Sequence, residues 1–292
     1  MPVHRSLLFA PGNHARRVEK CLTLGADAVI LDLEDAVADA EKSATRAVVV
    51  QALGRPRRSQ GYVRVNSLGT PWALGDFLAV VAPGVDGIVL PKVESASDLR
   101  TGEWLIESLE RERGLPAGSI DLIPIIETAA GFANLAAIAA AARRTRRLAF
   151  GAGDFTLDIG LTWSAEETEL LPYRSQLVVQ SRAAGLEPPL DTVWVSLDNP
   201  EGFQRSARRA SSLGFQGKLC IHPDQVPVVN ASFAPTPREL AQARRVIEAF
   251  EQAQREGLAA IQVDGQFVDY PILYRAQRLV ARAQAIESAQ RP

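Results

Sequence analysis

Two carboxylates, Glu127 and Asp154, stand where short apolar runs give way to glycine or small polar residues. Residues 123–126 read Ile-Pro-Ile-Ile before Glu127, and the run at 148–150 leads through Gly-Ala-Gly to Asp154. An ionised acid at the end of a buried strand is costly unless a cation meets it. Mg²⁺, or alternatively Mn²⁺, suits such oxygen ligands, so we predict a metal site on Glu127 and Asp154. For either acid alone, a helix cap or a surface ion pair is the alternative.

Other polar residues follow apolar runs and can join the same site. They are Asp32, Glu34, Asp35, Arg64, Asn66, Lys92, Glu94, Ser196, Asp198 and His222. Several acids that converge on one mouth repel one another unless a cation lies between them, which again favours a metal. Zinc does not fit this set, because the chain has only 3 histidines and two of them, His4 and His14, lie near its start.

Arg64 lies in the segment Val-Arg-Val-Asn at 63–66, where alternation places Arg64 and Asn66 on one face of a strand. A guanidinium within a strand needs an anion. It can bind a carboxylate through two hydrogen bonds, which points to an acidic substrate. The alternative is a structural ion pair with Asp32 or Glu34 inside the fold.

Three weaker signals allow other chemistry. Lys92 follows an apolar run and could form a Schiff base with a carbonyl substrate, although nearby acids should keep its ammonium charged. His222 could act as a general base, but a single histidine at such a place is more often a hydrogen-bonded structural group. The segment 11–13 with Arg16 and Arg17 could meet a phosphate near a helix start.

The elements that must position these residues repeat regularly along the chain. Eight apolar runs alternate with helical stretches, at residues 6–10, 28–33, 62–66, 87–91, 122–127, 148–151, 193–197 and 219–222. Most runs are continuously apolar, as in parallel strands covered on both sides. The pattern predicts an α/β fold, a (β/α)₈ TIM barrel whose active site lies at the carboxyl ends of its strands.

We place the barrel at residues 1–232 and a C-terminal extension at 233–292. The extension reads as a helix from Pro237 to near Gly257, a small hairpin at 261–271 that could form a lid, and a terminal helix. No linker of low complexity separates the two parts.

Composition limits the class of partner. The chain of 292 residues carries 32 Lys plus Arg against 34 Asp plus Glu, so no basic field recruits nucleic acid or an anionic membrane. The Ala-rich segment 129–142 is too short to span a membrane, and we expect no secretory signal. Two distant cysteines, Cys21 and Cys220, suggest a reducing, cytoplasmic location. A small-molecule substrate is expected.

Several motifs together resemble the citrate lyase beta-subunit-like proteins, of the metal-dependent acyl-CoA lyase and aldolase group. The motifs are RSLLFAPGN at 5–13, GADAVILDLEDAV at 25–37, VRVN at 63–66, LPKVE at 90–94, IET at 126–128 and IHP at 221–223. The resemblance covers nearly the whole chain. It implies a homotrimeric TIM barrel that cleaves or forms a carbon–carbon bond β to an acyl-CoA or related acidic thioester.

The resemblance also implies roles for single residues. Glu127 and Asp154 match the residues that hold Mg²⁺, while Glu34 and Asp35 match catalytic acids close to the metal and its waters. Arg64 matches the arginine that holds the acidic end of the substrate, and we expect Arg5 and Asn66, from the same motifs, to assist it in substrate binding.

The lid hairpin carries a further expected role. The segment Val-Asp-Tyr-Pro at 268–271 resembles a lid element whose aspartate reaches into a neighbouring subunit's site, which makes Asp269 a candidate catalytic base, with Asp264 as its competitor. One departure from the relatives is Gly153, which stands before Asp154 where many of them carry a larger residue. We expect it to change the shape of the pocket.

The expected reaction is a retro-Claisen cleavage of a citramalyl-, malyl- or citryl-CoA type thioester to acetyl-CoA and an oxo acid. Two alternatives stay open. One is a metal-dependent aldolase that acts on free 4-hydroxy-2-oxo acids. The other is a thioester-binding subunit of a larger lyase complex that does not catalyse alone.

Overall fold

The structure is a computed structural model that describes residues 3–290. The chain forms two compact units, one spanning His4–Asn230 and the other beginning at Ala231. In residues 3–290 no helix is both long enough and apolar enough to cross a membrane. The Ala-rich segment forms two short helices, Ala129–Ala133 and Leu135–Ala141, with Asn134 between them.

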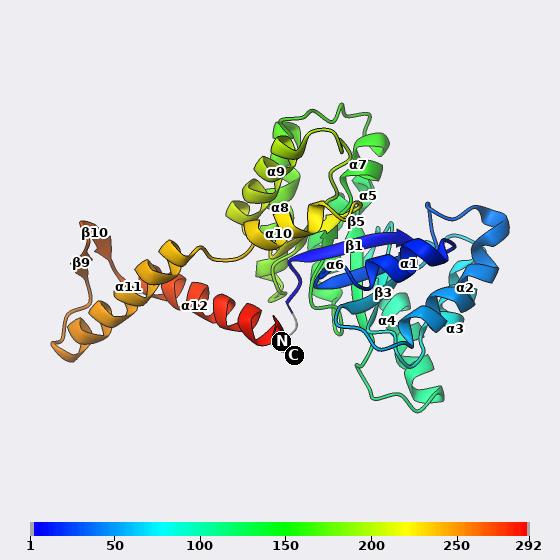
Figure 1. Ribbon diagram of the computed structural model, residues 1–292, viewed down its shortest axis with the longest axis horizontal. Coiled ribbons are helices and arrows are strands. Elements are labelled where there is room, and N and C mark those ends of the chain that lie inside the picture. Colours follow the sequence, from blue (N-terminus) through cyan, green and yellow to red (C-terminus); the bar gives the residue numbers. More distant parts are fainter. Residues whose placement is uncertain (1–2, 291–292) are drawn as a thin grey trace. The chain divides into compact units, whose positions relative to one another are not determined.

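Eight parallel strands close into a barrel in the first unit, in the same order as along the chain (Figure 1). They are β1 (Ser6–Pro11), β2 (Ala28–Asp32), β3 (Gln60–Arg64), β4 (Gly87–Leu90), β5 (Asp121–Ile126), β6 (Ala149–Phe150), β7 (Leu190–Asp191) and β8 (Gly217–Cys220). The barrel closes between β1 and β8, where Leu7 pairs with Leu219. The predicted (β/α)₈ fold is confirmed.

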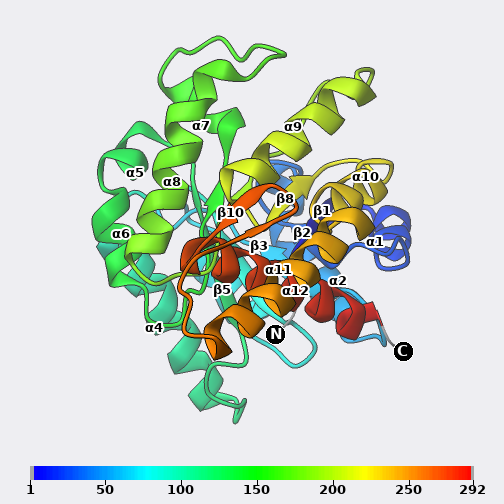
Figure 2. The ribbon, with the colours of Figure 1, turned by 90° about the vertical axis from the view of Figure 1, so that its left-hand side faces the viewer.

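Helices follow the strands and surround the barrel (Figure 2). They are α1 (Ala15–Cys21), α2 (Asp39–Leu53), α3 (Ala73–Val80), α4 (Ala96–Glu112), α5 (Ala129–Ala133), α6 (Leu135–Ala141), α7 (Ala152–Asp158), the 3₁₀ helix η1 (Thr168–Leu170), α8 (Leu171–Ala183), α9 (Pro200–Leu213) and α10 (Gln225–Ser232). Helix α4 shows how local sequence sets a helix start. Ser95 and Asp98 form a capping box that satisfies backbone N–H groups of the first turn.

Apolar side chains from most of the strands fill the barrel interior. Leu7, Ile30, Val89 and Ile123 are at most 1 % exposed and belong to one continuous cluster. Burying each such side chain contributes about 1.5–3 kcal/mol. This packed interior makes the strand ends rigid supports for the side chains that follow them.

The seventh strand differs from the prediction. It is formed by Leu190 and Asp191, not by residues 193–197, because Leu190 pairs with both Ala149 and Gly217. The run 193–197 has the composition of a strand, yet Val195 and Leu197 are more than half exposed. Pairing with two neighbouring strands, rather than β propensity, decides which residues enter the sheet.

The second unit contains a helix, a hairpin and a terminal helix, as predicted. They are α11 (Pro237–Arg255), β9 (Ile261–Val263), β10 (Gln266–Val268) and α12 (Tyr270–Gln290). Helices α11 and α12 lie side by side in Figures 1 and 2 and share a core that includes Phe250 and Val268. Asp264 and Gly265 both have positive φ angles, 50° and 80°, as expected for an Asp-Gly hairpin turn.

Candidate active site

Acids from several strand ends meet at the carboxyl end of the barrel. Glu127 follows β5 directly, and Asp154 lies in the first turn of α7, just after β6. Glu34 and Asp35 follow β2. These four acids lie around Lys92, which follows β4, so the barrel brings together residues that are up to 120 positions apart in the sequence.

Glu127 is the most deeply placed of these acids, with 2 % of its surface exposed. Its Oε1 accepts the backbone N–H of Lys92 at 2.8 Å. Its Oε2 lies against Gly151, where an added Cβ would stand only 2.2 Å from that oxygen. Burial raises the pKa of Glu127 to about 8, and the negative charges of Asp154 and Glu34 add to this effect. The carboxylate therefore needs more positive charge than the side chains nearby supply.

Lys92 brings an ammonium group into the cluster. Its Nζ lies 2.7 Å from Glu34 Oε1, 3.6 Å from Asp154 Oδ1 and 3.8 Å from Asp35 Oδ1. Partial burial disfavours the charged ammonium, but the hydrogen bond to Glu34 and the three acid charges outweigh it and raise the pKa of Lys92. The prediction that the acids keep this lysine charged is confirmed. A charged ammonium is a poor nucleophile, which counts against the Schiff-base mechanism.

Arg64, the last residue of β3, is held by Asp32 through two hydrogen bonds of 2.7 and 2.6 Å. Burial alone would raise the pKa of Asp32, but the charge and hydrogen bonds of Arg64 lower it. The guanidinium also lies over the Phe9 ring, 5.0 Å from its centre. The structural ion pair considered above is thus present, and Nη1, 3.0 Å from Glu34 Oε2, is the guanidinium nitrogen not bound to Asp32.

Glu34 and Asp35 differ in environment although they are adjacent in sequence. The Glu34 side chain is 7 % exposed and lies between Arg64 and Lys92, whereas that of Asp35 is 57 % exposed. Burial raises the pKa of Glu34, and Asp35 adds to the shift, while Arg64 and Lys92 oppose it. A carboxyl whose pKa is moved towards neutrality is suited to accept and release a proton.

Two predicted substrate-binding residues lie away from this cluster. Arg5 precedes β1 and pairs with Asp27 at 2.7 Å, so it lies at the amino end of the strands. Asn66 is 2 % exposed, and its side chain bonds to Lys42, Asp76 and the carbonyl of Leu33. In this structure the hydrogen bonds of Asn66 join the loop after β3 to α2, to α3 and to the residue that follows β2. The substrate-binding role of both residues stays a prediction.

The two lid aspartates belong to the second unit. Asp269 is partly buried, and its Oδ1 accepts the backbone N–H of Ile272 at 3.3 Å at the start of α12. Asp264 lies in the turn between β9 and β10 and forms an exposed ion pair with Arg245 at 3.2 Å. The catalytic role of Asp269 stays a prediction.

His222, the histidine that follows the eighth strand, is partly exposed and makes a local hydrogen bond. The side chain of His222 is 45 % exposed, and its Nδ1 accepts the backbone N–H of Asp224 at 3.3 Å. Residues 196 and 198, which were predicted to follow the seventh strand, lie in an exposed segment beyond β7 and do not end a strand.

The donor set of the cluster fits a hard divalent cation. In the described part of the chain, no three His, Cys, Asp or Glu side chains converge closely enough to hold a metal ion by themselves. Mg²⁺ does not require this, since it commonly takes one or two carboxylates and completes its shell with water and substrate oxygens. Burial and the charges of Asp154 and Glu34 raise the pKa of Glu127, and a cation at this place would offset that excess of negative charge.

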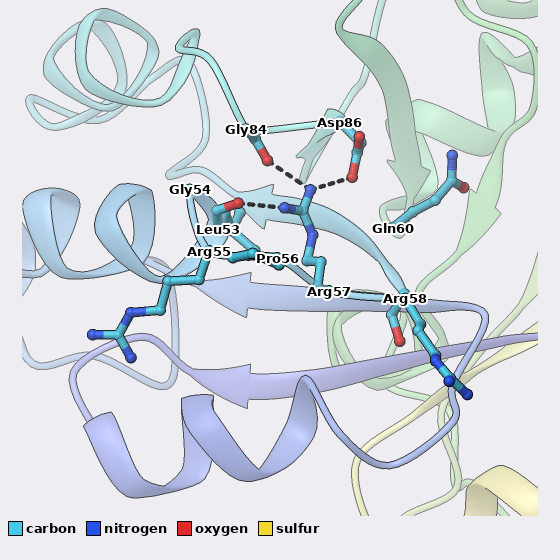
Figure 3. Close-up of a pocket in the computed structure, with 10 residues that line it drawn as sticks. Leu53, Gly54, Arg55, Pro56, Arg57, Arg58, Gln60, Gly84 and Asp86 are labelled. Atoms are coloured by element: carbon cyan, nitrogen blue, oxygen red, sulfur yellow. Dashed lines mark hydrogen bonds and ion pairs between the residues drawn. The ribbon is translucent and has the colours of Figure 1, made fainter. Parts of the chain in front are cut away.

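A cavity opens beside Lys92, and a second one lies at the opposite end of the strands. The first, of about 350 Å³, is lined by residues 67–69, 90–94 and 98. The second, of about 460 Å³, lies between the loops that precede β3 and β4 (Figure 3). There the guanidinium of Arg57 bonds to Leu53, Gly84 and Asp86, so it joins two loops rather than facing a ligand.

Sequence reasoning missed two features of the site. Lys92 was considered only as a nucleophile, although its place among acids already indicates a counter-ion. The ion pair of Arg64 was left open between Asp32 and Glu34 and stood only as an alternative to substrate binding, whereas Asp32 is the residue that orients Arg64. The matched register of Asp32 with Arg64 on neighbouring strands was the signal that could have shown it.

Known proteins are similar to this chain in sequence and in fold. Residues 5–223 match the family model of the HpcH/HpaI aldolase/citrate lyase family. The citrate lyase subunit beta of Leuconostoc mesenteroides subsp. cremoris is 39 % identical over 97 % of this chain and 94 % of its own length. The mitochondrial citramalyl-CoA lyase of Mus musculus is 31 % identical over 97 % of this chain and 87 % of its own.

A solved structure agrees with the sequence relatives. Protein CitE of Mycobacterium tuberculosis, in complex with magnesium, acetoacetate and coenzyme A, superimposes with a TM-score of 0.78 at 33 % identity. The match covers 97 % of this chain and 98 % of that one. With the family model matching most of the sequence and relatives matching nearly all of it, this chain belongs to the HpcH/HpaI aldolase/citrate lyase family.

Proposed function

We propose that this protein is an Mg²⁺-dependent carbon–carbon lyase that cleaves a 3-hydroxyacyl-CoA thioester of the citramalyl, malyl or citryl type. The products are acetyl-CoA and an oxo acid. The observation that carries the proposal is the acid cluster at the carboxyl end of the barrel, in which Glu127 and Asp154 lie beside two cations, Lys92 and Arg64. The names of the relatives support the substrate class.

Glu127 and Asp154 would hold the metal, and Lys92 joins Asp154 to Glu34 and Asp35 through its ammonium group. When bound, a divalent cation lowers the pKa of a substrate hydroxyl and holds the adjacent carboxylate oxygens in place. The Nη1 of Arg64 points at Glu34 and would bind the acidic end of the substrate beside it.

A base must remove the hydroxyl proton for the carbon–carbon bond to break. Glu34 has the raised pKa that such a role requires, and Asp269 is the second candidate. As the proton passes to the base, the hydroxyl carbon becomes the carbonyl of the oxo acid. The electron pair of the broken bond passes to the acetyl thioester as an enolate, which then takes up a proton. The ammonium of Lys92 and the guanidinium of Arg64 offset the negative charge during this step.

The finer assignments rest on the family resemblance. We propose a homotrimer, with an acyl-CoA as small-molecule partner and no role for nucleic acid or membranes. We also propose a cytoplasmic location, which suits the two free and buried cysteines, Cys21 and Cys220. Light scattering of the purified chain measures the oligomeric state directly.

A product assay tests the function. Purified protein is supplied with citramalyl-CoA, malyl-CoA or citryl-CoA, with Mg²⁺ or with EDTA, and acetyl-CoA is measured. We expect cleavage only with metal, and a loss of at least about 1,000-fold in Glu127→Ala and Asp154→Ala. Glu107→Ala, an exposed acid on α4, is the matched control and should keep full activity. Undiminished cleavage in EDTA, or in either site variant, would refute the proposal.

Two other functions are favoured by particular findings. The family description includes aldolases, so free 4-hydroxy-2-oxo acids belong in the same assay. The relative that is 39 % identical is named as a subunit, which makes a thioester-binding subunit of a larger complex the second candidate. Binding of a CoA thioester with Mg²⁺ present, but no turnover of any substrate, would support the subunit.

A further inference from the structure

Lys92 combines a strained backbone with an ammonium group that faces the acids. Only three non-glycine residues in the described range 3–290 have a positive φ, and Lys92 is one of them, at 51°. The left-handed conformation costs about 1–2 kcal/mol for a residue with a side chain. Strain of this kind persists only where the surroundings hold the residue in place, and it gathers at functional sites.

Both the backbone and the side chain of Lys92 contact acids of the site. The backbone N–H of Lys92 donates to Glu127, while the side-chain Nζ of the same residue reaches Glu34 and Asp154. The ammonium therefore links acids that come from the ends of β2 and β6, on either side of its own strand. Its side chain is 32 % exposed, whereas that of Glu34 is only 7 % exposed, so the ammonium keeps access to solvent on one side.

The acids of this cluster outnumber its cations. Five carboxylates meet here, those of Asp32, Glu34, Asp35, Glu127 and Asp154, against the two cations Arg64 and Lys92. Arg64 is committed to Asp32 by two hydrogen bonds. Lys92 is the cation that stands beside Asp154, where an added divalent cation would repel it.

We propose that the Lys92 ammonium is a built-in counter-ion that holds the acids together before metal binds, weakens metal binding by repulsion and strengthens binding of the anionic substrate. The inference rests on the metal site proposed above. It makes Lys92 a positioning residue that sets the exchange of the metal, and it predicts opposite effects of one substitution on two ligands.

Metal binding to the full chain tests this directly. Mn²⁺ is titrated by calorimetry or electron paramagnetic resonance into wild type, Lys92→Met and Lys92→Arg. We expect Lys92→Met to bind Mn²⁺ about tenfold more tightly, because a positive charge has been removed within a few ångströms of the ion. Lys92→Arg, which keeps the charge, should stay near wild type. Lys20→Met, an exposed lysine on α1, should not change Mn²⁺ binding.

Two further measurements separate charge from structure. Binding of pyruvate in the presence of saturating Mn²⁺ should weaken at least about fivefold in Lys92→Met, since the anion loses a cation. The tighter Mn²⁺ binding should shrink as salt is added, because the ammonium is partly exposed and is screened. A purely structural defect would weaken both ligands and would not follow the salt concentration.

A glycine variant covers the possibility that Lys92→Met does not fold. Lys92→Gly removes the ammonium and also relieves the left-handed backbone, so it should fold and bind Mn²⁺ as tightly as Lys92→Met is expected to. A change in Lys92→Gly alone, with Lys92→Met folded and unchanged, would assign the effect to the backbone and overturn the proposal. So would weaker or unchanged Mn²⁺ binding in both variants.

Failure of the proposal for Lys92 can be distinguished from failure of the proposed metal site. If wild type binds no Mn²⁺, or if Asp154→Asn binds it as well as wild type, the site proposed on Glu127 and Asp154 is wrong. If Asp154→Asn loses Mn²⁺ while Lys92→Met gains nothing, only the role of Lys92 is wrong.

Discussion

At the scale of residues, the site depends on how closely backbone and side chain approach one another. Glu127 has no room to move on one side, because its Oε2 lies against the backbone of Gly151 and its Oε1 is held by the Lys92 N–H. A buried carboxylate with one oxygen hydrogen-bonded and the other packed near backbone is a pre-organised ligand. The position of the ligand, rather than its mere presence, then determines the affinity for a small cation such as Mg²⁺.

Gly151→Ala should weaken metal binding without unfolding the protein. The new Cβ would stand 2.2 Å from Glu127 Oε2 and 2.6 Å from its Cβ, so the carboxylate must move. We expect Mn²⁺ affinity to fall at least about tenfold, since misplaced ligands lose much of their binding energy. Calorimetric titration measures it.

Gly153→Ala is the matched control for that substitution. Gly153 lies in the first turn of α7 with no other group within 4 Å of an added Cβ, so the methyl group meets open space. It should leave Mn²⁺ binding unchanged, because the new methyl group does not touch the acids of the site. A Cβ at position 153 would therefore lie outside the packed site. Equal effects of both substitutions would contradict the steric explanation.

Asp32→Asn should destabilise the barrel through Arg64. Asp32 is 2 % exposed and provides both hydrogen bonds that orient the guanidinium, so its amide variant leaves a buried cation poorly paired. We expect a loss of about 3 kcal/mol in the free energy of unfolding, measured in urea. Arg55→Ala breaks an exposed pair with Glu19 and should cost less than about 1 kcal/mol. Similar losses in both variants would show that burial does not control the effect.

At the scale of elements, a buried network holds the segment that follows α7. The guanidinium of Arg174, on α8, bonds to Asp191 of β7 and to Glu167, which precedes η1. Lys218 of β8 also pairs with Asp191. All four side chains are at most 1 % exposed. The network therefore ties two short strands and one loop into a single rigid part of the barrel.

The network predicts how stability changes with pH. Burial would raise the pKa of Asp191, but the charges of Arg174 and Lys218 outweigh it and lower the pKa below its usual value of 3.8. A carboxyl with a lowered pKa stabilises the fold above its unfolded pKa, and this stability is lost as the pH falls through the folded pKa.

Asp191→Asn removes that contribution. We expect a loss of about 3 kcal/mol in the free energy of unfolding at pH 7, with a smaller difference from wild type below pH 4. Urea denaturation at the two pH values checks it. A difference that does not shrink in acid would assign the loss to packing rather than to charge.

The predicted elements show what a local pattern can and cannot specify. The strand predicted at 87–91 forms over Gly87–Leu90, because glycine begins it and proline follows it. The start of α4 is likewise marked locally, by the capping box of Ser95 and Asp98. The seventh strand was wrong because a run of β-branched and aromatic residues, 193–197, competes with a two-residue strand at Leu190. Only pairing with β6 and β8 distinguishes the two.

At the scale of the whole molecule, the barrel and the C-terminal unit each hold part of the expected catalytic set. The cluster around Glu127 lies in the first unit, and Asp269 lies in the second. The proposed trimer gives these parts two ways to combine, within one chain or between neighbouring chains. A complementation experiment separates them.

Asp269→Ala and Glu127→Ala should each be inactive alone and active when mixed. If the aspartate acts on a neighbouring subunit's site, random assembly gives about a quarter of the sites both an intact barrel and an intact lid. Acetyl-CoA release after dissociating and reassembling the mixture measures the recovery. Absence of any recovery in mixed trimers would favour action within one chain, and Asp264→Ala serves as the control that should remain active.

The sequence by itself determined the barrel, its C-terminal extension and the strand ends where acids gather. Apolar runs, their period and the glycines between them are local properties of the chain, and they survive in the fold. Only the tertiary structure decided which charges meet. It paired Arg64 with Asp32, placed Arg5 beside Asp27, enclosed Asn66 and aimed Lys92 at Glu34 and Asp154. These contacts join residues far apart in sequence, and their strength depends on burial and distance, which no local pattern contains.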